Sequence, residues 1–189
     1  MKKFSFIFDR SKKAKILKKN ILKNYRNWPI KRSNIIIVGG GDGFMLKTIK
    51  NLYKFNKPFY GINCGSIGFL LNRYLSKKIS QRVNKAKITT IYPLQIKTVS
   101  RGKKRSSFLA INELSLLRQS KQTALLKLKI NKKILIKKLI GDGVLLSTPA
   151  GSTAYNLSVH GPILSLNSKK LAITPISPFR PRRWKGKIV

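Results

Sequence analysis

The chain has 189 residues and carries 42 Lys and Arg against four Asp and Glu, a formal net charge of +38. An apolar fraction of 42% predicts a folded protein with one sizeable core or two small ones, and it argues against disorder. The single cysteine, Cys64, excludes an internal disulfide and a cysteine-based metal cluster. Because the apolar runs are too short to span a bilayer, we expect a cytoplasmic protein without a membrane partner.

The positive charge suggests a polyanion, and nucleic acid is the first candidate. However, basic residues occur from Lys2 to Lys187 with no separate basic tail, and aromatic residues are not interleaved with the lysines as in a stacking platform. We therefore favour a generally basic surface over a specific nucleic-acid site. The sequence predicts weak, salt-dependent attraction of polyanions.

The first half of the chain alternates between strand and helix patterns. Residues 3–9 read as a buried strand, 11–25 as an amphipathic helix and 34–40 as a β-branched strand, which together predict a β-α-β unit. A helix over 42–55 and a strand over 58–63 follow. This order predicts a Rossmann-like parallel sheet with helices, in which ligands bind at the carboxyl ends of the strands.

From about Pro93 the pattern becomes β-rich, with strand-like segments separated by polar turns at 94–101, 107–118, 124–131 and 133–139. We therefore expect two domains, an α/β domain over 1–92 and a β-rich domain over 93–189. No internal repeat or low-complexity linker separates them, so the predicted boundary rests only on the change from alternating helix and strand patterns to strand patterns alone.

A glycine-rich loop, Gly39-Gly40-Gly41-Asp42-Gly43, follows the second predicted strand. Glycines after a strand let the backbone approach a ligand, and the amides of the next helix start form a phosphate site. The spacing fits neither G-x-G-x-x-G nor the P-loop. A carboxylate beside phosphate would repel it unless the carboxylate holds a metal ion or accepts a proton from an attacking hydroxyl. The alternative is that Asp42 is the N-cap of the helix.

A second candidate segment, 141–164, combines an Asp-Gly pair with clustered hydroxyl side chains before a predicted helix at 153–158. The hydroxyls belong to Ser147, Thr148, Ser152, Thr153, Tyr155 and Ser158. Small donors and acceptors at a helix start suit ribose hydroxyls and phosphate oxygens. An ordinary Ser/Thr-rich turn is the alternative.

A third candidate is the pair Asn112-Glu113 inside a strand pattern. Neighbouring strand residues point to opposite faces, so one of the pair must face inward or meet a ligand. Three of the four carboxylates of the chain, Asp42, Glu113 and Asp142, fall within these three segments. Where acids are so scarce, these loops are the expected functional sites.

Together these segments resemble the NAD kinase family. The resemblance covers GGDGFML (40–46), GINCGSIGFLLN (61–72), INE (111–113), the whole of 141–164 and LAITPISPFRPRRW (171–184). The GGDG motif alone also resembles phosphofructokinases and lipid kinases. The segment at 141–164 matches no lipid-kinase loop, so a lipid kinase is disfavoured.

The resemblance implies transfer of the terminal phosphoryl group of ATP, or in some members of polyphosphate, to the 2′-hydroxyl of the adenosine ribose of NAD, giving NADP. It implies that Asp42 is the proton acceptor. It implies NAD contacts from Gly43, Asn112, Glu113, Asp142, Ala150, Thr153, Ala154, Tyr155, Asn156, Leu157 and Ser158. The resemblance also implies a divalent metal ion, with Mg²⁺ as the first candidate, that accompanies ATP and has no assigned protein ligand. It further implies a homo-oligomer. Phosphoryl transfer depends mainly on alignment and charge neutralisation, which agrees with a positioned carboxylate.

One departure concerns the C-terminal domain. Family members continue with further strands beyond the segment at 171–184, whereas this chain stops at Val189. We therefore expect a truncated β-rich domain with uncovered strand edges and apolar faces. Two other interpretations stay open, a catalytically impaired remnant that keeps the fold and a basic polyanion-binding protein.

Overall fold

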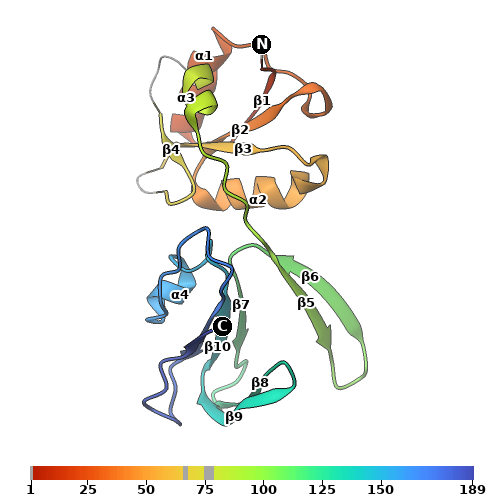
Figure 1. The fold of residues 1–189 in the computed structure, drawn as a ribbon, viewed down its shortest axis with the longest axis vertical. Helices are drawn as coiled ribbons and strands as arrows, with labels where there is room; N and C mark the ends of the chain where they lie inside the picture. Colours follow the sequence, from red (N-terminus) through yellow and green to blue (C-terminus); the bar gives the residue numbers. More distant parts are fainter. Residues whose placement is uncertain (1, 66–67, 75–78) are drawn as a thin grey trace. The chain divides into compact units, whose positions relative to one another are not determined.

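The computed structural model describes residues 2–65, 68–74 and 79–189, so residues 66 and 67 of the motif at 61–72 lie outside the described part. The chain divides into two compact units, Met1–Ile88 and Thr89–Val189. Figure 1 shows helices around a sheet in the first unit and mostly strands in the second. This confirms the predicted fold class, an α/β part followed by a β-rich part.

The first unit contains a parallel sheet in the order β1-β2-β3-β4. Its elements in chain order are β1 (Phe4–Phe8), α1 (Lys12–Leu22), a 3-10 turn at Ile30–Arg32, β2 (Ile35–Gly40), α2 (Asp42–Leu52), a 3-10 turn at Tyr53–Phe55, β3 (Phe59–Asn63), β4 (Asn72–Arg73) and α3 (Ile79–Lys85). The predicted strands and helices of this part are confirmed, with helices that end earlier than expected. The helix predicted over 42–55 ends as a 3-10 turn.

The central strand β2 is buried along its whole length because helices cover both faces of the sheet. Ile35 and Ile37 pack into a core cluster with residues of α1 and α3. Ile36 and Val38 point to the opposite face, where Met45 of α2 covers them. The uninterrupted apolar run of β2 is therefore the sequence signature of a strand inside a three-layer arrangement.

The second unit contains an antiparallel sheet in the order β12-β11-β10-β7 and two separate hairpins, β5–β6 and β8–β9. The strands are β5 (Leu94–Val99), β6 (Arg105–Ala110), β7 (Glu113–Leu117), β8 (Ala124–Ile130), β9 (Lys133–Gly141), β10 (Gly143–Ser147), β11 (Ala172–Ile176) and β12 (Lys187–Ile188), and the one helix is α4 (Tyr155–Ser158). Leu139, Leu145 and Ala172 are fully buried in this unit.

The segment predicted as one strand pattern over 107–118 is two strands. β6 pairs with β5, whereas β7 pairs with β10, so the chain changes partner at Ile111 and Asn112. The break is fixed by hydrogen bonds, because Thr148 donates from its amide to the carbonyl of Asn112 and from its hydroxyl to the carbonyl of Ile111. The polar pair Asn112-Glu113 thus marks a strand start.

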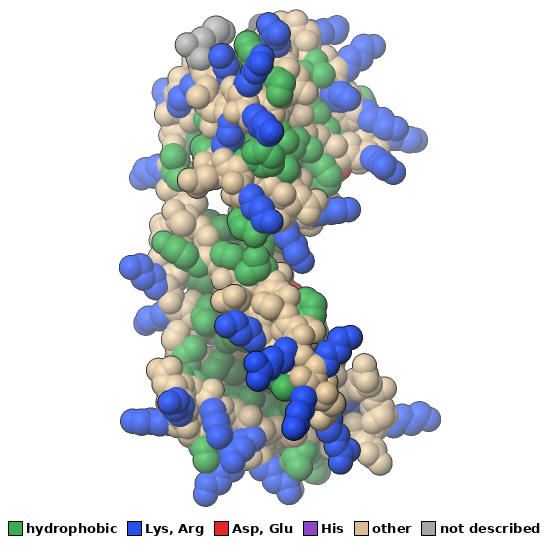
Figure 2. Space-filling view, turned by 90° about the vertical axis from the view of Figure 1, so that its right-hand side faces the viewer, with side chains coloured by type: hydrophobic (Ala, Val, Ile, Leu, Met, Phe, Trp, Pro, Cys, Tyr) green, Lys and Arg blue, Asp and Glu red, His purple; other side chains and the backbone are tan. Residues whose placement is uncertain are grey.

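The surface of both units is basic. Figure 2 shows Lys and Arg side chains over the whole visible face, with very few acidic side chains among them. Large apolar side chains are also exposed on the two hairpins of the second unit, including Val99, Phe108, Leu125 and Ile134. Among the described residues, no helix is long and apolar enough to cross a membrane.

Candidate functional site

The glycine loop joins β2 to α2 and contains glycines with two different roles. A Cβ atom on Gly39 would lie 2.6 Å from the ring of Phe8, and one on Gly40 would lie 2.8 Å from the ring of Phe44, so both glycines are needed for packing. A Cβ atom on Gly41 or Gly43 would meet nothing within 4 Å. The second half of the loop therefore leaves open space at the start of α2, where backbone amides are free to bind an anion.

Asp42 is the first residue of α2, and the N-cap position is occupied by Gly41. The interpretation of Asp42 as the N-cap is therefore wrong. Its carboxylate instead accepts one hydrogen bond on each oxygen, from the amides of Phe69 at 2.7 Å and Leu70 at 3.1 Å. These bonds hold the half-buried carboxylate in one orientation beside the glycine loop.

Asp9 was missed by the sequence reasoning, although it follows β1 directly. A Cβ atom on Gly40 would lie 3.0 Å from Oδ2 of Asp9, so this carboxylate faces the glycine loop. Oδ1 of Asp9 accepts hydrogen bonds from the amide and the hydroxyl of Ser11, the N-cap residue of α1. The rule that ligands bind at the carboxyl ends of parallel strands would have identified this position.

Asn112 and Glu113 lie at the start of β7, next to the hydroxyl-rich loop after β10. Glu113 pairs in register with Ser147, and the backbone of Asn112 contacts Thr148 and Gly151. Oδ1 of Asn112 and Oε2 of Glu113 are buried without a hydrogen-bond partner among the described residues. Buried polar atoms are normally paired, so these two atoms mark a place where a ligand can bind.

Burial also affects the protonation of this site. Loss of solvation raises the pKa of the Glu113 carboxyl above its usual range. A protonated carboxyl can donate a hydrogen bond, whereas a carboxylate only accepts. Oε2 of Glu113 has no partner among the described residues, so the carboxylate can accept a hydrogen bond from a sugar hydroxyl there.

The hydroxyl cluster at 147–158 divides into buried and accessible members. Ser147, Thr148 and Ser152 are buried and donate to backbone carbonyls of the surrounding loops. These three hydroxyls therefore shape the loop, as the alternative of a Ser/Thr-rich turn would have them do. Tyr155 and Ser158 are exposed and Thr153 is half-buried, so these remain accessible.

The helix predicted at 153–158 is shorter in the structure. Turns cover 151–154, and α4 has only the four residues Tyr155–Ser158. Within it Asn156 is fully buried, whereas Tyr155 and Leu157 are 36% and 43% exposed. Alternate residues of this segment therefore point into the protein and out to solvent.

Asp142 lies between β9 and β10 and forms an ion pair with Arg118. Nε of Arg118 is 2.6 Å from Oδ1 of Asp142, and the two side chains are 34% and 36% exposed. Arg118 also donates to the carbonyl of Ser120. The carboxylate of Asp142 is thus neutralised, with one oxygen left for another contact.

These motifs and their fold are shared with known proteins. A family model described as the ATP-NAD kinase C-terminal domain matches residues 111–183. A NAD kinase of Zymomonas mobilis is 44% identical over 189 residues, which cover 99% of this chain and 73% of that protein. The chain belongs to the NAD kinase family. A NAD kinase of Caulobacter vibrioides is 47% identical over 157 residues, which cover 83% of this chain and 60% of that protein.

Solved structures of this family have the same fold. Yeast NADH kinase complexed with NADH matches with a TM-score of 0.76 at 20% identity, covering all of this chain and 69% of the yeast chain. A NAD kinase from Archaeoglobus fulgidus in complex with ATP matches with a TM-score of 0.73 at 22% identity, covering 99% of this chain and 76% of that one. The predicted membership of the NAD kinase family, a family of phosphotransferases, is confirmed.

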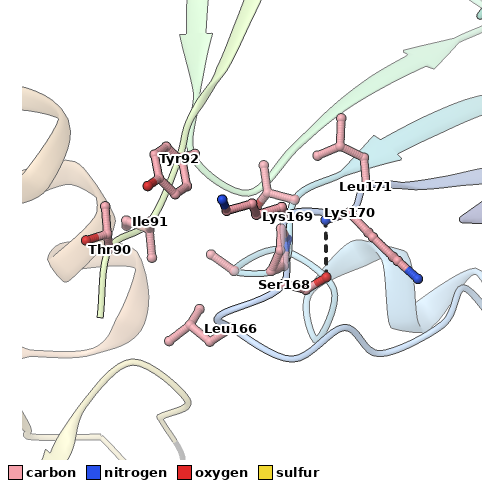
Figure 3. Close-up of a pocket in the computed structure, with 11 residues that line it drawn as sticks. Thr90, Ile91, Tyr92, Leu166, Ser168, Lys169, Lys170 and Leu171 are labelled. Atoms are coloured by element: carbon pink, nitrogen blue, oxygen red, sulfur yellow. Dashed lines mark hydrogen bonds between the residues drawn. The ribbon is translucent and has the colours of Figure 1, made fainter. Parts of the chain in front are cut away.

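One residue implied by the family resemblance, Ala150, lies on a cavity of about 370 Å³ in the second unit. Figure 3 shows Tyr92, Leu166 and Lys169 among the residues around it. The lining is mostly apolar, with lysines and Ser168 on one side. The amide of Lys170 donates to the hydroxyl of Ser168, which fixes this part of the wall. Ala150 therefore lies on the wall of this cavity together with its neighbours Thr148 and Pro149.

Proposed function

We propose that the chain transfers the terminal phosphoryl group of ATP, or of polyphosphate, to the 2′-hydroxyl of the adenosine ribose of NAD, forming NADP. The names of its curated relatives support NAD phosphorylation. The ATP complex of the Archaeoglobus fulgidus kinase supports ATP as the donor. We also propose that the protein works in the cytoplasm, in agreement with its single cysteine.

The observation that carries this proposal is the pair of unpartnered buried atoms, Oδ1 of Asn112 and Oε2 of Glu113. An unpaired polar group inside a protein is costly, so a ligand that supplies hydrogen-bond donors is favoured there. Ribose hydroxyls are such donors. The two residues lie beside the Thr148–Gly151 turn, which belongs to the segment 141–164 that resembles the NAD kinase family.

We assign the remaining NAD contacts to Gly43, Asp142, Ala150, Thr153, Ala154, Tyr155, Leu157 and Ser158. Asn156 differs from them because its side chain is fully buried and bonded within the protein. We therefore give the side chain of Asn156 a positioning role, in which it holds the accessible residues on either side of it.

Asp42 is proposed as the proton acceptor. A hydroxyl is a weak nucleophile, and a positioned carboxylate can take its proton as the phosphoryl group is transferred. The amide bonds from Phe69 and Leu70 keep the carboxylate oriented before substrate arrives. Each oxygen accepts only one of these bonds, so each keeps a lone pair for the substrate hydroxyl.

A divalent metal ion is proposed to arrive with ATP. Mg²⁺ is usually held by one or two carboxylates together with substrate phosphates, and not by an all-protein cage. In the described ranges, no group of three or more His, Cys, Asp or Glu converges on a common point. Asp9, whose carboxylate faces Gly40, and Asp42, which lies within the glycine loop, are the carboxylates that would hold such an ion. When bound, the ion would neutralise phosphate charge.

We further propose that the protein forms a homo-oligomer. Val99 and Leu125 are 68% and 65% exposed on the hairpins of the second unit. The two side chains lie on separate hairpins, β5–β6 and β8–β9, and exposed apolar side chains of this size favour burial against another protein surface. A second copy is the partner that the family resemblance implies.

The decisive test is NADP formation by the purified chain with NAD, ATP and Mg²⁺, compared with Asp42→Asn. Loss of the general base is expected to lower kcat by about 10² to 10⁴-fold. Lys18→Gln, on an exposed position of α1, is the control and is expected to keep full activity. Thermal unfolding must show that all three proteins fold.

Two results would count against the proposal. A folded wild-type chain without activity, with polyphosphate as well as with ATP, would favour the catalytically impaired remnant. An Asp42→Asn variant as active as wild type would remove Asp42 from the reaction. Neither result would change the family membership.

A further inference from the structure

A short segment after β11 combines arginines with aromatic residues. Five of the eight residues from 180 to 187 are basic, compared with 42 of 189 in the whole chain. Phe179 precedes this run and Trp184 lies within it. We call residues 179–184 the arginine segment. In this segment two aromatic residues, Phe179 and Trp184, flank three arginines.

The backbone of the arginine segment is anchored to the end of β9. The amides of Phe179 and Arg180 both donate to the carbonyl of Ile140, at 2.8 and 3.1 Å. The amide of Ile140 donates back to the carbonyl of Arg180 at 2.8 Å. A further bond from the amide of Trp184 to the carbonyl of Pro181 closes a turn. The segment is therefore held in a defined shape on a strand.

Two guanidinium groups converge on one aromatic ring. The guanidinium carbon of Arg180 lies 4.9 Å from the ring centroid of Phe179, and that of Arg182 lies 5.3 Å from it. The two carbons are therefore at most 10.2 Å apart, the sum of these distances. Phe179 is nevertheless 50% exposed, so part of its ring is open to solvent.

These arginines have no anionic partner in the described part of the chain, where the ion pair found is Arg118–Asp142. The guanidinium groups of Arg180, Arg182 and Arg183 also donate no hydrogen bond to described residues. Two like charges held near one ring repel each other, and an anion placed between them relieves this repulsion. Guanidinium groups suit phosphate because their N–H groups match two oxygens at once.

We propose that the arginine segment is a binding site for single-stranded nucleic acid. Phosphates lie on Arg180, Arg182 and Arg183, and a base stacks on the exposed part of the Phe179 ring. Unpaired bases present flat faces that a duplex hides, which is why an exposed ring favours a single strand. Lys137 and Lys138 of β9 are both exposed, shortly before the anchoring residue Ile140, and they extend the basic surface along the strand.

The overall charge of the protein dictates the design of the test. Basic side chains are spread over the face shown in Figure 2, so any polyanion is attracted to some degree. A specific site is distinguished from general electrostatic attraction by comparing two variants. One removes charges from the arginine segment, and the other removes the same number of charges elsewhere on the surface. The triple variant Arg180→Ser/Arg182→Ser/Arg183→Ser removes three charges from the segment. Lys97→Gln/Lys127→Gln/Lys129→Gln removes three charges from the hairpins of the same unit.

The measurement is fluorescence anisotropy of a labelled 12-nucleotide oligouridine at several salt concentrations. The arginine variant is expected to bind at least tenfold more weakly than wild type, with the salt slope reduced by about 2 because each lost phosphate contact lowers it by about 0.7. The lysine variant is expected to change affinity less than threefold. Phe179→Ala is expected to weaken oligouridine binding about fivefold or more by loss of stacking, and to leave heparin binding unchanged.

Three outcomes would overturn the proposal. Equal losses in the two triple variants would show that bulk charge, and not the segment, attracts the RNA. An unchanged affinity of Phe179→Ala would show a general polyanion site without base stacking. Equal affinity for a 12-base-pair duplex would exclude a preference for single strands. Unchanged thermal unfolding of every variant is required, and none of the substituted residues has a proposed role in the kinase reaction.

Discussion

The hydroxyl of Thr174 donates a hydrogen bond of 2.7 Å to Oδ1 of Asn156, and both residues are buried. Nδ2 of Asn156 donates to the carbonyls of Ser152 and Pro162, so the amide is fully used. One side chain thus joins α4, the turn before it, the loop after it and strand β11. The accessible residues Tyr155 and Leu157 on either side of Asn156 depend on this anchor for their position.

Replacement of Asn156 by Ala is expected to destabilise the second unit by about 2–4 kcal/mol, because a buried hydroxyl and two carbonyls lose their partner. Chemical denaturation measures this loss. Thr174→Val removes one of the three bonds and should cost less, about 1–2 kcal/mol. Asn167→Ala, on an exposed residue, is the control and should stay within about 0.5 kcal/mol of wild type. An Asn156→Ala variant as stable as the control would contradict this anchoring role.

Glu113 is expected to make stability depend on pH. Burial raises the pKa of its carboxyl, so the folded chain binds this proton more tightly than the unfolded chain does. The contribution to stability is therefore fully present below the ordinary Glu pKa of about 4.3, and it is lost as the pH rises through the raised value. At neutral pH the ionised carboxylate opposes folding.

Glu113→Gln keeps the shape of the side chain and removes the ionisation. Its melting temperature should exceed that of wild type at neutral pH, and the difference should shrink toward zero as the pH falls to the ordinary Glu pKa of about 4.3. The same variant should bind NAD more weakly, since a ligand contact is altered. Thermal unfolding across this pH range, with and without NAD, measures both effects. A constant difference at all pH values would show that desolvation of the charge is not its cause.

The parts of the fold that could be predicted are those in which one local pattern decides the structure. Strand β2 has helices on both faces, so all of its residues are buried and apolar side chains are needed on both sides. The resulting uninterrupted β-branched run predicts a buried strand from the local sequence alone. The break between β6 and β7 could not be predicted in this way. It depends on bonds from Thr148, a residue 37 positions away from Ile111. Long-range partners of this kind leave no periodic signal in the sequence.

The same limit applies to the candidate site. The glycine loop was located by its place after a predicted strand, and the rarity of acids in this chain drew attention to the carboxylates beside it. The division of the hydroxyl cluster into structural and accessible members was not predictable. The hydroxyl of Ser152, for example, donates to the carbonyl of Leu164 and accepts from its amide, 12 residues further along the chain. Asp9 was overlooked because it belongs to no motif, although its place directly after the first predicted strand brings it to the glycine loop.

The ion pair of Arg118 with Asp142 is expected to contribute little to stability. Both side chains are about one third exposed, and such pairs contribute about 0–1 kcal/mol and weaken in salt. Arg118→Met should therefore unfold within about 1 kcal/mol of wild type. Asp142→Asn should have a similar effect on stability but should also raise the KM for NAD, because we assign Asp142 to the substrate. Equal KM values for the two variants would argue against a direct contact from Asp142.

Gly151 is expected to tolerate no side chain, because the backbone of Asn112 lies against it. A Cβ atom at this position would overlap the carbonyl group of Asn112 and lie 2.7 Å from its Cα, so backbone must move. Gly151→Ala should therefore cost about 1–3 kcal/mol of stability, which denaturation measures.

The same displacement should reach the substrate, because it shifts Asn112 and Glu113 away from the hydroxyl loop. The KM for NAD should rise, whereas the KM for ATP should change less. Gly102→Ala is the matched control. Gly102 lies in the turn between β5 and β6, and a Cβ atom at this position would meet nothing within 4 Å. If Gly151→Ala lowered stability but left the KM for NAD at the wild-type value, the contact between this turn and Asn112 would serve folding alone, and the assignment of Asn112 and Glu113 to NAD would lose its support.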